Sequence, residues 1–385
     1  MNSHLLYWWK DSAVFSRLRG LEERLRFERA ELRFVNLPPA AEPFYDATMG
    51  PFDRFPYHWL TLVDADGVTG SAPCWGDPKG LLRRLVGGTA RTYIEWYHEL
   101  YWSIRNRGFR SEAACELAAV DAAMQDILAK RAGLPLHRFW GAERSEVDVY
   151  ASGGSTHFTD KQLVEEMTSF VEAGFTALKM KVGTRFGTEM ERDVERVRAV
   201  RRAVGPSVRL AVDANQCWTA DQALEFARRV AEYDIAWFEE PVHSADLKAH
   251  EQVAASSPIP IAAGESVRTY FDFERLIEAG VQHLQPAPHV LPGIVEWGMT
   301  RDAAERRGLE LTSGGFTPYT AAFCATTRSG WVEYLVQLIR PFVESLAGPP
   351  IIRNGVYRLP EAPGLGIEPD WERLEKLGLV ETWSA

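Results

Sequence analysis

Cysteine is scarce in this 385-residue chain, and the cysteines that are present show no paired spacing. A zinc motif, a redox pair and a disulfide framework all need closer or more regular spacing than that of Cys74, Cys115, Cys217 and Cys324. We therefore expect each cysteine to be a small core or surface residue in a reducing compartment, which favours a cytoplasmic protein.

Long apolar runs and blocks of basic residues are missing as well. No stretch approaches the length of a membrane span, and the apolar patch in the first twelve residues is too short for a secretory signal peptide. The formal net charge is −10. We therefore expect neither nucleic acid nor a membrane surface as a partner. A composition of 46% hydrophobic and 25% charged residues is that of a globular protein.

From about residue 146 onward, short apolar runs alternate with longer amphipathic stretches. The stretches have helical spacing and begin at capping residues, whereas the runs are typical of buried strands. The eight runs are VDVYAS, ALKMKV, RLAVDA, IAWFEE, IPIAAGES, VQHLQP, LELTSG and WVEYL. Eight β/α units in about 190 residues predict an α/β fold with a (β/α)8-type TIM barrel rather than an open sheet.

The first part of the chain has a different pattern. RFERAELRFV and HWLTLVDADGVTGSA are typical of antiparallel strands, the second with a turn at Asp66-Gly67. ACELAAVDAAMQDILAKRAG then predicts a helix with one apolar stripe, formed by Leu117, Val120, Met124, Ile127 and Leu128. We expect an N-terminal α+β capping domain over residues 1–140, the barrel over 141–345, and a tail over 346–385 that returns to the cap.

Two lysines lie on the strand ALKMKV, although burying an unpaired ammonium group is costly. Because side chains alternate faces along a strand, Lys179 and Lys181 share the face opposite Leu178 and Met180. In a barrel the lysine face points inward, toward the C-terminal mouth where such barrels carry their active sites. The lysines therefore need a negatively charged partner inside the barrel.

Three carboxylates supply a candidate partner. The same alternation points Asp213, Glu239 and Glu265 inward, each at the end of its own strand and each 26 residues from the next. A single acid at a strand end is more often a helix cap or a surface ion pair. Three that converge would repel one another unless a cation lay among them, and carboxylate oxygens suit Mg²⁺ better than Zn²⁺.

With these residues in place, the chain resembles the enolase superfamily, in its mandelate racemase/muconate lactonising branch, and is similar to acid sugar dehydratases. The resemblance is carried by the K-x-K of LKMKVG, the Asp and Asn of VDANQ, the first Glu of EEP and the Glu of AGES. LAAVDAAMQDILAKRAGLPLHRFWGA is similar to the family helix between cap and barrel, and LPEAPGLGIEPD is similar to the family tail.

The resemblance implies an enzyme with one Mg²⁺ per subunit, held by Asp213, Glu239 and Glu265. It implies that Lys181 is the base that removes a proton α to a carboxylate. Lys179 would contact the substrate carboxylate and lower the pKa of Lys181, since adjacent ammonium groups disfavour each other's charge. The cation would stabilise the resulting enediolate, as in other members of this superfamily. We expect a small-molecule carboxylate as substrate and a homo-oligomer.

The pattern breaks where many members of this branch carry a second acid/base. Ala287 stands at the matching position of the sixth strand, and no histidine follows His289, so the usual His-Asp dyad is missing. Because racemisation needs groups on both faces of the carbanion, the leading hypothesis is a hydro-lyase that carries out syn dehydration of a hydroxy or sugar acid with Lys181. The alternatives are a cycloisomerase, a racemase or epimerase, and a lapsed enzyme that serves as a ligand-binding barrel.

Four further residues are candidates for contacting the substrate. Asn215 has the same inward parity as Asp213. Glu333 matches an eighth-strand Glu that some relatives bond to the substrate carboxylate, or it pairs with an arginine. His289 has the inward parity, with a solvated loop position as the other interpretation. Tyr45 lies in the aromatic stretch 38–59, which either covers the barrel mouth as a lid or packs within its own loop.

Overall fold

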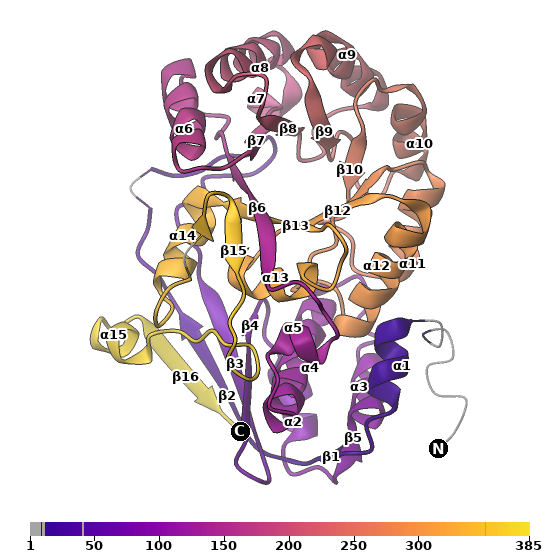
Figure 1. Ribbon diagram of the computed structural model, residues 1–385, viewed down its shortest axis with the longest axis vertical. Coiled ribbons are helices and arrows are strands. Elements are labelled where there is room, and N and C mark those ends of the chain that lie inside the picture. Colours follow the sequence, from indigo (N-terminus) through magenta and orange to yellow (C-terminus); the bar gives the residue numbers. More distant parts are fainter. Residues whose placement is uncertain (1–8, 10–11, 41, 351) are drawn as a thin grey trace.

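The computed structural model describes residue 9 and residues 12–40, 42–350 and 352–385. In this part of the chain, eight parallel strands form a barrel that closes where the last strand pairs with the first (Figure 1). The strands are β6 (Glu146–Gly153), β7 (Ala177–Lys181), β8 (Arg209–Asp213), β9 (Ile235–Glu239), β10 (Ile261–Ala263), β11 (His283–Leu284), β12 (Glu310–Ser313) and β13 (Trp331–Leu335). Seven strands lie within their predicted runs, and β6 extends one residue beyond its run at each end, which confirms the barrel.

Helices follow the strands and form the outer layer of the barrel (Figure 1). They begin where the sequence provides caps: Thr159 and Thr219 each form a capping box with the glutamine three residues later. The main helices of this layer are α6 (Asp160–Glu172), α8 (Met190–Val204), α9 (Ala220–Val230), α10 (Leu247–Ser256), α11 (Tyr270–Glu278), α12 (Ile294–Arg307), α13 (Thr317–Cys324) and α14 (Val336–Glu344); a short turn of helix, α7 (Thr184–Gly187), precedes α8.

An antiparallel sheet lies beside the barrel. Its order is β16-β2-β3-β4, with β2 (Phe27–Val35), β3 (Tyr57–Asp64), β4 (Thr69–Cys74) and β16 (Val380–Ser384). Gly67 takes the positive φ of 78° that the β3–β4 turn needs. Figure 1 shows β16 beside β2, so the C-terminal end of the chain completes a sheet that the N-terminal part begins.

Smaller elements complete this part of the chain. On the N-terminal side they are α1 (Ala13–Arg19), β1 (Arg24–Leu25), α2 (Lys79–Leu85), β5 (Arg91–Thr92), α3 (Tyr93–Ser103) and α5 (Leu136–Phe139). On the C-terminal side they are β14 (Ile352–Arg353), β15 (Val356–Arg358) and α15 (Trp371–Lys376). β15 pairs antiparallel with β6, so it extends the barrel sheet at that strand.

Helix α4 (Glu112–Arg131) is buried on every side, which differs from the single apolar stripe expected from its sequence. It packs on β3 and β4 of the antiparallel sheet and also contacts α12 of the barrel. Six alanines between Ala113 and Ala123 let these neighbours approach closely. The helix therefore joins the two parts, and its polar residues are bonded inside: Asp121 accepts hydrogen bonds from Tyr93 and from the Ile294 amide.

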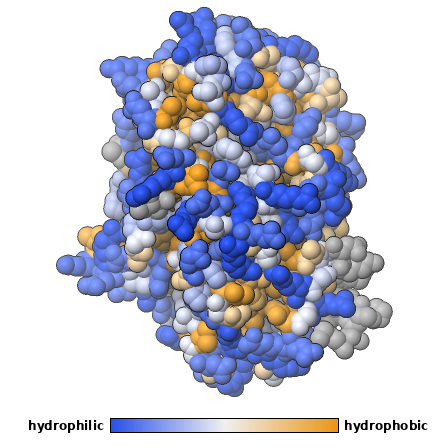
Figure 2. All heavy atoms as spheres, viewed as in Figure 1, coloured by the Kyte–Doolittle hydropathy of each residue, from blue (hydrophilic) through white to orange (hydrophobic). Residues whose placement is uncertain are grey.

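The barrel interior has a small core of its own beneath the mouth. It is formed by inward-facing residues of five strands, Tyr150, Ala177, Ala211, Trp237 and Ala262. Outside, hydrophilic side chains cover most of the face seen in Figure 2, with apolar residues in separate patches. Among the described helices, none is both long and apolar enough to cross a bilayer.

Candidate active site

Strand register brings the predicted lysine and carboxylates together at the barrel mouth. Lys181 lies directly opposite Asp213 across the β7–β8 pair, and Asp213 lies opposite Glu239 across the β8–β9 pair. Glu265 follows β10, the next strand of the barrel. One carboxylate oxygen from each of the three acids lies within 4.8 Å of the others. Three carboxyl groups far apart in the sequence therefore form one oxygen-lined site.

Lys179 is fully buried and bonded to several carboxylates. Its Nζ donates to Glu239, lies 2.9 Å from Oε1 of Glu333 and lies 3.4 Å from Oδ2 of Asp213. Burial lowers the pKa of Lys179, but the nearby carboxylates of Glu239 and Glu333 raise it by more than burial lowers it. The net pKa is therefore well above its usual value. An ammonium group has three protons to donate. Lys179 is therefore a fixed cation that joins β7 to β8, β9 and β13.

Lys181 has fewer partners. In the described chain its Nζ contacts one acceptor, Oδ2 of Asp213, at 2.5 Å. Burial and the nearby Lys179 lower the pKa of Lys181, but Asp213 raises it, and the net pKa lies above its usual value. The predicted lowering by Lys179 is thus present, and the ion pair with Asp213 outweighs it.

The mouth has more carboxyl groups than its two lysines can pair with. Asp213, Glu239, Glu265 and Glu333 lie around the two ammonium groups, and Glu240 lies beside Glu265; together these five form an acidic cluster. Burial and then Asp213 raise the pKa of Glu239 to about 8, and burial and then Glu240 raise the pKa of Glu265 to about 8. A divalent cation such as Mg²⁺ would relieve the repulsion among these oxygen donors and keep their carboxylates charged.

Two residues that hold Glu239 in place were not singled out from the sequence. The indole of Trp237 donates to Oε2 of Glu239 at 3.1 Å, and the side-chain amide of Gln285 donates to the same oxygen. Both residues have the inward parity that located the acids, since Trp237 lies two positions before Glu239 and Gln285 two before Ala287. The same rule, extended to donors, would have found them.

A cavity of about 440 Å³ lies at the barrel mouth and is called the mouth cavity here. Glu265 and Glu333 lie in its wall, so it reaches the acidic cluster. Ala287 also lines it, at the position where the resemblance to this superfamily predicts a second acid/base. The rest of the wall comes from the β2–β3 loop, the end of β4, α4 and α14, so both parts of the protein contribute.

His289 lines the mouth cavity and is buried, so the solvated-loop interpretation is wrong. Its ring stacks on Trp75, with centroids 5.0 Å apart, and a Cβ on Gly315 would meet the imidazole at 2.2 Å. The glycine backbone therefore lets the ring lie flat against the wall. Burial and then Arg268 lower the pKa of His289 to about 3, so the ring is neutral.

The other three candidates lie in different surroundings. Asn215 donates from its backbone N–H to Oδ1 of Asp213 at 2.9 Å and from its side-chain amide to Oδ2 at 3.4 Å. Its own Oδ1 is buried without a partner in the described chain. Glu333 pairs with Lys179 rather than with an arginine, and Lys179 lowers its pKa against the opposing effect of burial. Tyr45 stacks on His157, with centroids 3.6 Å apart. Of the aromatic residues in stretch 38–59, Phe55 lines the mouth cavity.

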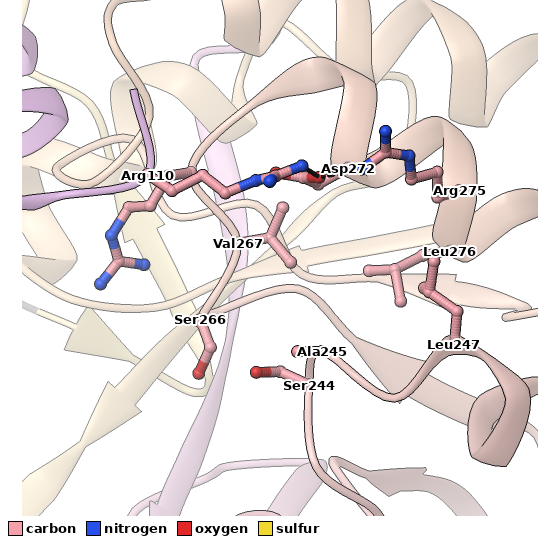
Figure 3. Close-up of a pocket in the computed structure, with 10 residues that line it drawn as sticks. Arg110, Ser244, Ala245, Leu247, Ser266, Val267, Asp272, Arg275 and Leu276 are labelled. Carbon is pink, nitrogen blue, oxygen red and sulfur yellow. Dashed lines mark hydrogen bonds and ion pairs between the residues drawn. The ribbon is translucent and has the colours of Figure 1, made fainter. Parts of the chain in front are cut away.

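A second hollow lies beside the mouth cavity (Figure 3). The two share Ser266 and Arg268 in their walls, so the polar side of the mouth continues into this hollow. Figure 3 shows Arg110 extended toward Asp272, with which it forms a two-point ion pair. Arg110 is thus already paired with Asp272. The acidic residues of the candidate active site lie at the mouth cavity instead.

Comparison with protein-family models places residues 162–373 in the family described as enolase C-terminal domain-like. This range includes Lys179, Lys181 and the three converging acids. It spans more than half of the chain.

Known proteins with similar sequences match nearly the whole chain. It is 30% identical over 365 residues to the 3,6-anhydro-alpha-L-galactonate cycloisomerase of Streptomyces coelicolor, covering 91% of this chain and 98% of that one. It is also 30% identical over 362 residues to the L-talarate/galactarate dehydratase of Salmonella typhimurium, covering 89% and 88%. The crystal structure of that dehydratase with Mg and L-lyxarohydroxamate superposes with a TM-score of 0.85 at 26% identity, covering 94% and 95%.

Proposed function

Because this chain belongs to the enolase C-terminal domain-like family, in the mandelate racemase branch of the enolase superfamily, we propose that it is a Mg²⁺-dependent enzyme that dehydrates a hydroxy acid. The observation that carries the proposal is the placement of Lys181 at 2.5 Å from Asp213, beside Glu239 and Glu265. A proton acceptor and an oxygen-lined cation site then lie side by side at one cavity.

Asp213, Glu239 and Glu265 would hold one Mg²⁺ per subunit. The bound cation supplies positive charge toward the substrate carboxylate while the neighbouring carbon loses its proton. Trp237 and Gln285 fix the Glu239 carboxylate, and Asn215 fixes that of Asp213. The ligand set is thus oriented before a substrate arrives, which is what electrostatic stabilisation requires.

Lys181 is the proposed base, and Lys179 is the proposed fixed cation beside it. With Asp213 bound to the cation, Lys181 would lose the ion pair that raises its pKa, and the nearby Lys179 would favour its neutral form. Neutral Lys181 takes the proton from the α-carbon, and the electron pair of that C–H bond forms the carbon–carbon double bond. The β-hydroxyl then leaves as water with a proton returned by Lys181 on the same face, and the enol becomes a 2-keto acid. Lys179 is held by three carboxylates, so it stays charged and faces the substrate carboxylate.

Glu333 and His289 are proposed substrate contacts because both lie in the wall of the mouth cavity. Asn215 is proposed for the same role because its buried Oδ1 has no partner within the described chain. Tyr45 remains a predicted contact, and its stacking on His157 would have to open for it to reach a substrate.

Cycloisomerisation is the second candidate, since a relative with this activity matches 91% of the chain at 30% identity. It too could proceed with Lys181 alone. A racemase or epimerase is less well supported, because Ala287 replaces the second acid/base. Product analysis separates the reactions: dehydration gives a 2-keto acid that reacts with semicarbazide, whereas an isomerase leaves the composition of the substrate unchanged.

The test is a screen of hydroxy acids with Mg²⁺, followed by Lys181→Met on each substrate found. Loss of a positioned base should lower kcat by at least about a hundredfold. The matched control is Lys161→Met, because the Lys161 side chain is 83% exposed on α6. Turnover that persists in Lys181→Met would remove this lysine from the role of base, and no turnover of any acid would favour a lapsed enzyme.

A further inference from the structure

The wall of the mouth cavity has a charged side and an apolar side. The charged side holds Glu112, Glu265, Arg268 and the polar Ser266, together with Glu333, which pairs with Lys179. The apolar side is built from three separate segments: the β2–β3 loop, the end of β4, and the β13–α14 region. Its side chains are those of Met49, Phe55, Trp75, Leu335, Leu338 and Ile339.

Aromatic contacts hold this apolar side in one arrangement. Trp75 stacks on His289, whose ring meets Phe316 edge-on at 5.6 Å, and Phe316 meets Phe55 at 5.5 Å. A row of rings that brace one another forms a preformed surface, and preformed surfaces lose little entropy on binding.

Two large side chains of this surface are left open. Trp75 is 50% exposed and Met49 is 61% exposed, although both lie at the entrance to a cavity. Exposed apolar groups that line a cavity mark a place where an apolar group of a ligand binds. A bound apolar group would cover them, whereas a chain of hydroxyls would not gain from the contact.

Hydroxyl groups would find few partners among the side chains of Met49, Phe55, Leu335, Leu338 and Ile339. A sugar acid carries a hydroxyl on nearly every carbon, and each one placed against Leu335, Leu338 and Ile339 would lose its bonds to water without replacement. A hydroxyl buried without a partner weakens binding by roughly tenfold. The sugar acids named for the relatives are therefore poor matches to this wall, and a common scaffold does not fix the substrate.

We propose, on the basis of the dehydration described above, that the substrate is a 2,3-dihydroxy acid whose β-carbon carries an aryl or branched alkyl group. The acid head lies at the lysines, and the apolar group lies on the surface formed by Trp75, Phe55 and Leu338. The reaction breaks the α-C–H bond and the β-C–O bond and releases water. Its product is a 2-keto acid with the apolar group on carbon 3.

The experiment compares two acids with the same head and different tails. 2,3-Dihydroxy-3-phenylpropanoate carries the apolar tail, and 2,3,4-trihydroxybutanoate carries a hydroxymethyl group instead; all stereoisomers of each are used with the Mg²⁺-loaded protein. Titration calorimetry measures binding, and the semicarbazide assay measures turnover. The phenyl acid should bind at least about tenfold more tightly and show the higher kcat/KM.

Leu338→Gln tests the wall itself, because Leu338 is only partly buried and its change leaves the core intact. It should weaken binding of the phenyl acid and leave the trihydroxy acid unaffected or bound more tightly. The matched control is Leu377→Gln, since Leu377 is 63% exposed and lies after α15. The control should bind both acids as the wild type does.

The outcomes separate this inference from the proposed function. If the trihydroxy acid binds as tightly as the phenyl acid or more tightly, the inference is overturned. If the wild type dehydrates the trihydroxy acid and Lys181→Met does not, the dehydratase proposal still stands. The phenyl acid could also bind more tightly but show neither turnover nor exchange of its α-proton in deuterium oxide. That result would support the inference and count against the dehydratase proposal. If Leu338→Gln loses the preference for the phenyl acid and the control keeps it, the apolar side of the mouth cavity is the surface that binds the phenyl group.

Discussion

At the scale of single residues, Lys179 and Lys181 look alike in the sequence but differ in their surroundings. Lys179 meets three carboxylates of the mouth, whereas Lys181 meets Asp213. Strand parity predicts that both point inward, and it says nothing about partners. The difference comes from side chains of β9 and β13, each two strands away from β7 in the barrel, and no local pattern reveals such contacts.

Lys179→Met should destabilise the fold. The change leaves Glu239 and Glu333 buried next to Asp213 without their shared cation, and breaking a buried ion pair in this way costs about 3 kcal/mol or more. The free energy of unfolding from urea titrations measures the loss, with the exposed Lys161→Met as control. A loss no larger than that of the control would contradict the description of Lys179 as a fixed cation.

Trp237→Phe should weaken Mg²⁺ binding and keep the fold. The variant retains the ring in the barrel core but removes the N–H that bonds Glu239, and loss of such an orienting bond lowers metal affinity by about 10- to 100-fold. Calorimetric titration with Mg²⁺ gives the affinity, and Trp331→Phe is the comparison because Trp331 lies beside Arg209. An affinity equal to that of the wild type would show that Glu239 needs no such support.

At the scale of elements, the sequence predicts the barrel strands well because each is an isolated apolar run with turn residues on both sides. It predicts the convergence of Asp213, Glu239 and Glu265 for a related reason: parity and strand order are local properties. The sequence does not predict that α4 is buried on all sides. Its polar residues are typical of an exposed face, and the groups that cover them come from the sheet and the barrel, which lie far away in the sequence. The sequence likewise left a solvated position open for His289, because Trp75 and Gly315, which lie against its ring, come from distant segments.

The stability that α4 contributes should depend on pH through Asp121. Burial raises the pKa of Asp121 to about 7, so the folded state favours its protonated form. This contribution is complete below about pH 4 and is lost as pH rises through about 7, because the unfolded chain releases the proton more readily. The stability difference between wild type and Asp121→Asn should thus fall by up to about 1.4 kcal/mol per pH unit in this window.

Urea unfolding at several pH values from 4.5 to 8 measures this difference. Asp221→Asn is the control, because Asp221 is exposed at the start of α9. Its profile should run parallel to that of the wild type. A profile of Asp121→Asn that also runs parallel would mean that Asp121 keeps its charge inside the protein.

At the scale of the whole molecule, the mouth cavity exists only because the two parts of the chain are joined. Met49 and Trp75 come from the segments around the antiparallel sheet, while Leu338 and Glu265 come from the barrel. Helix α4 contacts both parts, and β16, which follows the barrel in the chain, returns to pair with β2 of the antiparallel sheet (Figure 1). The domain limits 1–140, 141–345 and 346–385 stay predictions, as do the homo-oligomer and the cytoplasmic location.

Mg²⁺ should stabilise the whole protein, because only the folded chain assembles the three ligands. At a concentration 100 times the dissociation constant, the free energy of unfolding should rise by about 2.7 kcal/mol. Glu239→Gln should lose most of this gain, while Glu165→Gln, at an exposed position on α6, should keep it. If Mg²⁺ raised the free energy of unfolding of Glu239→Gln as much as that of the wild type, the cation would have to bind elsewhere in the protein.

The central claim is that a cation held by Asp213, Glu239 and Glu265 lies next to Lys181 at the mouth cavity. A crystal structure with Mg²⁺ and a hydroxy acid bound to Lys181→Met tests it most directly. We predict Mg²⁺ at about 2.1 Å from an oxygen of each acid, and the α-carbon of the ligand facing the side chain at position 181. A cation bound elsewhere, or a ligand whose α-carbon faces away from that position, would contradict the account.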